Sequence, residues 1–150
     1  MDNTKAVIAF FEQNEWEYRE DEGVFESGVS LEGDVEGALL QIDANNGGIV
    51  VLCGLDYDIQ TEAFAVLFEF CNLVNMLLPT GAVFLDTTEQ IIVTRLGQYY
   101  GEGKASGDDV GEQVAFCIDL VERISSVLSS VINGEVSPAD ATELILRPQA

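Results

Sequence analysis

Histidine is absent from this 150-residue chain, and its absence decides most of the chemistry that the sequence can support. Without an imidazole there is no Ser-His-Asp or Cys-His nucleophile system, no histidine general base and no histidine ligand for zinc. Acid–base work would fall to pairs of carboxylates. With 27 aspartates and glutamates such pairs arise by chance, and only Asp86, at the end of an expected strand, stands apart. We therefore predict no catalytic residues and a protein that is not an enzyme, with a carboxylate-dependent enzyme as the alternative.

Gly103-Lys104 invites comparison with a phosphate-binding P-loop. That loop needs a glycine five residues before its last glycine, where this chain has Gln98. It also needs a magnesium-binding Ser or Thr after the lysine, where this chain has Ala105. The sequence therefore predicts a flexible connection over 101–107, no nucleotide site and no cofactor.

Asp56-Tyr57-Asp58 looks like the opening of a calcium loop, in which alternate side chains supply oxygen ligands. The third ligand position holds Gln60, the turn glycine is missing, and Leu67 stands where a bidentate glutamate should close the loop. The pattern favours a turn with an aspartate at the start of a helix. A divalent-metal-binding protein stays open as part of the alternative function.

Three cysteines lie far apart among aliphatic residues, at Cys53, Cys71 and Cys117. With no C-x-x-C pair, neither a zinc cluster nor a thioredoxin-type pair is predicted, and the thiols are expected to be buried in a protein of a reducing compartment. The N-terminus lacks the basic region of a signal peptide, and polar residues interrupt the longest apolar stretch, 63–78. We therefore expect a cytoplasmic protein that does not bind a membrane.

The net charge of −21, with only six lysines and arginines, disfavours contact with nucleic acid or anionic lipid. Acids are densest in segment 12–36, where ten of 25 residues are acidic and only Arg19 is basic. One interpretation is that these charges keep an edge strand from aggregating. The other is a surface for a basic or partly unfolded protein or peptide partner, formed by Glu17, Glu20, Glu26, Glu32 and Glu36.

Residue periodicity predicts the elements that would position these side chains. In chain order they are a helix from Asn3 or Thr4 to about Asn14, one or two short strands within 16–31, strands at 38–43 and 49–53, a helix from Asp58 or Thr61 to Leu78, strands at 82–86 and 90–96, a helix from Asp108 to about Ile132, and a short helix over 138–146. Asn45-Asn46-Gly47-Gly48 is the strongest hairpin signal, because Asn and Gly accept positive φ angles. We predict one α+β domain over 1–150 with an antiparallel sheet of about five strands.

The second long helix carries more apolar residues than one sheet-facing stripe requires. Phe64, Leu67, Phe68 and Val74 are expected to face the sheet. The outward residues Phe70, Leu73 and Leu77 then predict a homodimer, with Phe70 as its anchor. In the competing interpretation, the first and third helices cover this face within one chain.

Three blocks of sequence carry a resemblance to a known family: Trp16-Glu-Tyr18, Val35 to Asp43, and Glu69 to Asp86, in which Asn75 and Gly81 precede Phe-Leu-Asp86. Over about 4–132 the chain resembles the bacterial YbjN family and, in its order α-β-β-β-α-β-β-α, the type III secretion chaperone-like fold. The glycine-rich segment and the terminal helix depart from that pattern. The resemblance implies a small non-enzymatic protein, often dimeric, that binds a protein or peptide partner in a chaperone-like or regulatory role. It supplies no catalytic residues.

Overall fold

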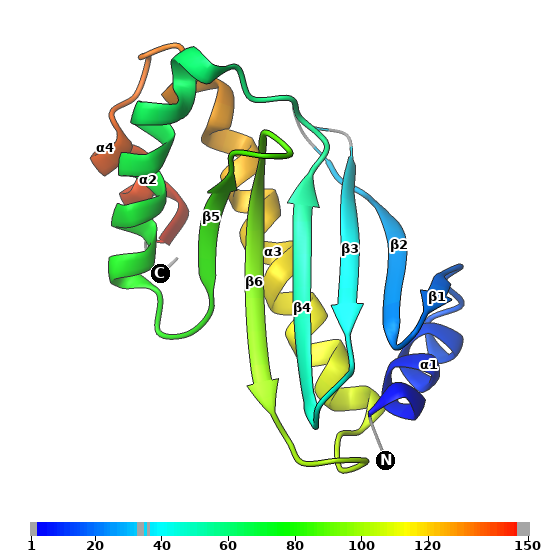
Figure 1. Cartoon of the computed structure of the whole chain (residues 1–150). Helices are drawn as coiled ribbons and strands as arrows, with labels where there is room; N and C mark the ends of the chain where they lie inside the picture. The colour runs from blue at the N-terminus through cyan, green and yellow to red at the C-terminus, as the bar shows by residue number, and fades with distance from the viewer. Residues whose placement is uncertain (1–2, 33–34, 36, 147–150) are drawn as a thin grey trace.

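The computed structural model describes residues 3–32, 35 and 37–146, and builds them into an antiparallel sheet with helices on one face and at one edge (Figure 1). The strands are β1 (Arg19–Asp21), β2 (Val24–Ser30), β3 (Gly37–Asp43), β4 (Gly48–Leu55), β5 (Ala82–Asp86) and β6 (Ile91–Tyr99), in the spatial order β1-β2-β3-β4-β6-β5. The helices are α1 (Thr4–Gln13), the 3₁₀ turn η1 (Thr61–Ala63), α2 (Phe64–Leu77), α3 (Gly107–Ile132) and α4 (Pro138–Leu146).

The predicted α+β class is confirmed, although the sheet has six strands where about five were expected. The additional strand is β1, whose three residues are charged and exposed. Such a strand shows no alternation of apolar and polar residues, so periodicity does not reveal it. The second helix begins at η1, which fits Thr61 and not Asp58 as its start.

The hairpin between β3 and β4 forms where the sequence predicts it. Asn46 and Gly47 have φ angles of 61° and 77°, the left-handed conformations that a two-residue turn requires. The side chain of Asp43 accepts a hydrogen bond of 2.9 Å from the backbone N–H of Asn45 and supports the turn. Local residue types therefore determine the register of the two central strands.

Helix α3 crosses the sheet diagonally, behind it in the view of Figure 1, and packs on β4 and β6. It begins with a capping box, in which Ser106 and Asp109 satisfy each other's backbone N–H groups. Gln113 is 2% exposed and donates hydrogen bonds of 2.9 and 3.0 Å to the carbonyls of Ile49 and Leu96. This amide fixes the helix against two neighbouring strands.

The two edges of the sheet differ. At one edge α2 stands beside β5 with α4 packed against it (Figure 1), and the side-chain amide of Asn75 pairs with the backbone of β5. Asn75 donates to the carbonyl of Val83 and accepts from its N–H, both at 2.8 Å. The amide thus occupies hydrogen-bonding positions that a further strand would use. The other edge is formed by short, charged β1, together with residues 27–30 of β2, which β1 does not cover.

Candidate functional site

A groove of about 540 Å³ lies between α1 and the first half of α3. Two adjacent rows of α3 form one side of it, and each row follows the i, i+4 spacing of a helix. One row consists of Gly107, Gly111, Ala115 and Asp119, and the other of Val114, Ile118 and Glu122. The side facing them comes from α1 and the loop after it: Phe10, Gln13, Asn14 and Trp16. We call this hollow the α1–α3 groove.

The groove is open because small residues of α3 face α1. A Cβ atom added at Gly107 would lie 3.5 Å from the Cβ of Ala9, and one at Gly111 would lie 3.7 Å from the ring of Phe10. Both are ordinary van der Waals distances, so the glycines bring the helices together without being required for contact. Ala115, the next residue in this row, is exposed and leaves the middle of the groove shallow.

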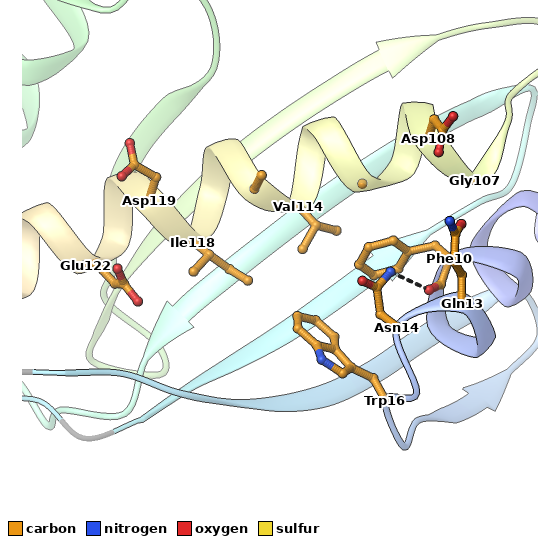
Figure 2. Close-up of a pocket in the computed structure, with 12 residues that line it drawn as sticks. Phe10, Gln13, Asn14, Trp16, Gly107, Asp108, Val114, Ile118, Asp119 and Glu122 are labelled. Atoms are coloured by element: carbon orange, nitrogen blue, oxygen red, sulfur yellow. Dashed lines mark hydrogen bonds between the residues drawn. The ribbon is translucent and has the colours of Figure 1, made fainter.

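Aromatic rings form the floor on the α1 side. The rings of Phe10 and Trp16 meet edge to face, with centroids 5.6 Å apart and an interplanar angle of 82°. Glu15, at φ 55°, turns the chain back, so that the N–H of Trp16 bonds the carbonyl of Phe11 at 3.0 Å. Figure 2 shows Trp16, Phe10 and Ile118 directed toward the space between the two helices. The turn therefore holds the indole ring beside the groove.

Acidic side chains lie at both ends of the groove (Figure 2): Asp108 at one end, and Asp119 and Glu122 at the other. Asp119 forms an ion pair of 3.1 Å with Arg123, which also donates to the carbonyl of Ile145. No lysine or arginine is among the described residues that line the groove. The hollow thus combines an apolar floor with a net negative rim.

The five glutamates predicted to form a partner surface do not share one face. Glu26 lies opposite Arg19 in the β1–β2 ladder and forms an ion pair of 2.7 Å with it, whereas Glu20 lies opposite buried Phe25, on the other face of the sheet. Glu17 and Glu32 are exposed in the segments before β1 and after β2. Glu36 lies outside the described residues. The predicted role of these acids stays a prediction.

The expected outward position of Phe70 is wrong, because its side chain is fully buried. Helix α2 buries one i, i+3, i+4, i+7 stripe, formed by Leu67, Phe70, Cys71 and Val74. Helix α4 packs on α2, so the buried stripe is set by α4 and β5 together and not by the sheet alone.

The outward side of α2 also differs from the expectation. Phe68, expected to face the sheet, is 50% exposed. Of the other two residues assigned to self-association, Leu73 is half-buried and Leu77 is 63% exposed. The apolar residues that α2 presents to solvent are therefore Phe68, Met76 and Leu77.

The remaining candidates for chemistry have structural roles. The carboxylate of Asp86 accepts hydrogen bonds of 3.0 Å from the N–H groups of Thr88 and Glu89, and so closes the turn between β5 and β6. The glycine-rich loop is held by the buried side chain of Asn3, which donates to the carbonyl of Gly101 and accepts from the N–H of Ala105. Among the described residues, no group of three or more acids or cysteines is placed to hold a metal ion.

The three thiols are free and buried, as predicted. Burial raises the pKa of Cys53, Cys71 and Cys117 from 9.0 to about 12. Neutral, buried thiols are poor nucleophiles and poor metal ligands. Within the part of the chain that the structure describes, no helix is long and apolar enough to cross a membrane.

Sequence reasoning missed the α1–α3 groove. It assigned Phe10, Val114 and Ile118 to ordinary core stripes, because each follows a helical period. The signal that was present is the row of small residues at 107, 111 and 115 in a helix whose other rows are bulky. That row becomes informative only when α1 is known to pack on α3.

The family model of YbjN, described as "Putative bacterial sensory transduction regulator", matches residues 3–129. Among solved structures, the chain is similar to "Crystal structure of YbjN, a putative transcription regulator from E. coli", with a TM-score of 0.64 and 11% sequence identity. That similarity covers 84% of this chain and 90% of the other. A comparison with curated proteins found no match. The resemblance seen in the sequence is thereby confirmed, and the chain belongs to the YbjN family.

Proposed function

We propose that this protein is a non-enzymatic regulator that acts in the cytoplasm by binding another protein. The observation that carries the proposal is the α1–α3 groove, an apolar hollow of about 540 Å³ with an acidic rim. Concave sites with an apolar lining and a few polar groups are typical binding sites. The description of the family as regulators supports a role of this kind.

The charge of the chain indicates how such a regulator would work. A net charge of −21 repels the phosphate backbone of nucleic acid, whose binding depends on lysine and arginine. The related structure is titled a transcription regulator. If this chain has a similar role, its charge favours action through a protein that binds DNA rather than through DNA itself. The same field would speed encounters with a basic partner.

The test is capture followed by reconstitution. The protein, carrying a photo-cross-linker at an exposed position on the far side from the groove, such as Glu62, is cross-linked in the cells that express it, and captured proteins are identified by mass spectrometry. Each captured protein is then purified and titrated against the wild-type chain by calorimetry at about 0.15 M salt, where surface charge is screened beyond about 8 Å.

We expect at least one captured protein to bind with a defined stoichiometry and to change its own activity when it is bound. If no captured protein binds again once purified, or if binding occurs only at low salt without stoichiometry, the proposed function is wrong.

A further inference from the structure

We propose that the occupant of the α1–α3 groove is a short basic amphipathic segment of the partner protein, with large apolar side chains on the floor and lysine or arginine at the rim. The inference rests on the proposed function and names the class of ligand that its site takes. Three features of the groove carry it: the sign of the rim, the apolar and aromatic floor, and its length along α3.

The rim selects a positive ligand. Among the described residues, Asp108 and Glu122 form no ion pair, and the nearby Arg123 is held by Asp119 and by the carbonyl of Ile145. A second copy of this chain would bring another charge of −21 to an acidic rim. Like-charge contact of this kind is unfavourable, so charge complementarity favours a basic occupant over self-association at this site.

The floor selects apolar side chains with a cationic flank. Ile118 and Trp16 are half-buried and border the hollow together with the ring of Phe10. They leave apolar surface that a leucine-sized or aromatic side chain would cover. Trp16 adds a second attraction, because the face of an indole ring is the best aromatic partner for a lysine or arginine cation.

The length of the groove sets the size of the ligand. From Asp108 to Glu122 the axis of α3 rises about 21 Å, at 1.5 Å per residue. A helical segment of about 14 residues would span that distance, with apolar anchors at i, i+3, i+4 and i+7. The probe is therefore an amidated peptide of about 14 residues, with leucine at those anchor positions and lysine elsewhere.

Trp16 is the single tryptophan of the chain and reports binding directly. Titration with the probe should change its fluorescence in a saturable way. A peptide of the same composition with scrambled order should bind about tenfold more weakly, and a peptide with glutamate in place of lysine should not bind. If calorimetry detects binding of the probe while Trp16 fluorescence stays constant, the ligand sits elsewhere and the inference is overturned.

Two matched pairs of variants locate the site. Ala115→Arg blocks the middle of the groove, and Ala65→Arg adds the same charge at an exposed position of α2. The double variant Asp108→Asn/Glu122→Gln neutralises the rim. Its control, Glu62→Gln/Glu143→Gln, removes two exposed charges at equivalent positions, one in a first helical turn and one further along a helix. Both double variants raise the net charge from −21 to −19.

We expect Ala115→Arg to weaken binding of the probe by about tenfold or more, and the rim variant to weaken it by about fivefold, since an exposed ion pair contributes little by itself. The two controls should stay within about twofold of wild type. Circular dichroism and melting curves verify that all four variants fold. Equal weakening by a groove variant and its control would show attraction to net charge alone and would overturn the inference.

The captured partner separates this inference from the proposed function. A partner that binds wild type and Ala115→Arg equally well leaves the function in place and refutes the groove as its site. A partner that loses binding with Ala115→Arg, but keeps it with Ala65→Arg, supports both.

Discussion

The amide of Asn75 pairs with the edge of β5 through two hydrogen bonds of 2.8 Å to the N–H and the carbonyl of Val83. Replacing it in Asn75→Ala removes both bonds and opens this edge of the sheet to solvent. Asn72, one turn earlier in α2, is also exposed, and its amide reaches only the sulfur of Met76, at 3.8 Å. Asn72→Ala is therefore a control with the same change of residue type in the same helix.

The magnitude follows from these contacts. A protein hydrogen bond contributes about 0.5–1.5 kcal/mol net, so two contribute about 1–3 kcal/mol. Because the side chain of Asn75 is exposed, water can replace part of each bond, and we take about 1.5 kcal/mol. Alanine is the better helix former by about 0.5 kcal/mol, which offsets part of the loss in Asn75→Ala and stabilises Asn72→Ala. The two variants should therefore differ by about 1.5 kcal/mol, or about 5 °C in Tm.

Urea unfolding followed by circular dichroism measures this difference at pH 7. We expect Asn75→Asp to be less stable than Asn75→Ala, because a carboxylate can accept from the N–H of Val83 but repels its carbonyl oxygen. If Asn75→Ala and Asn72→Ala have the same free energy of unfolding within about 0.5 kcal/mol, the amide does not stabilise the edge and the reasoning is refuted.

Three further predictions concern other parts of the chain. Gly111→Ala should raise stability by about 0.5–1 kcal/mol, because the new methyl group meets Phe10 at an ordinary 3.7 Å, whereas Gly134→Ala should lower it by about 1 kcal/mol, because Gly134 has a φ of 75°; denaturant unfolding of both variants checks the opposite signs. The three buried thiols should resist a thiol reagent until the protein unfolds, and their raised pKa predicts stability that is fully present below pH 9.0 and is lost as pH rises toward about 12, since the unfolded thiols ionise first; rapid labelling of folded protein would contradict this. We still expect a homodimer, now through the exposed side of α2: light scattering should show a folded monomer for Phe68→Glu, while the buried Phe70→Glu should unfold, and wild-type protein that is monomeric at high micromolar concentration would remove the dimer.

Features that depend on neighbouring residues were predictable from the sequence. The β3–β4 hairpin is one, because Asn46 and Gly47 accept the required φ angles wherever they occur. The start of α3 is another, because two aspartates follow a residue that can cap the helix. The three cysteines could be placed in the core from their aliphatic neighbours alone.

Features that depend on distant elements were not predictable. The orientation of α2 follows from α4 and from the pairing of Asn75 with β5, and the sequence shows Asn75 only as a polar residue in an apolar stretch. Phe70 was therefore assigned to the wrong side of the helix. The α1–α3 groove has walls about 100 residues apart in sequence, and no local pattern indicates that these two helices meet.

That separation has a consequence for the order in which the molecule is made. Helix α1 and the side chain of Asn3 leave the ribosome first, but their partners are Gly101, Ala105 and helix α3. At a synthesis rate of about 5–20 residues per second, α1 waits about 5–20 s with its apolar stripe unpaired. The α1–α3 groove cannot exist in a nascent chain that lacks α3. A ligand of that groove would therefore distinguish chains in which α3 has docked from those still being translated.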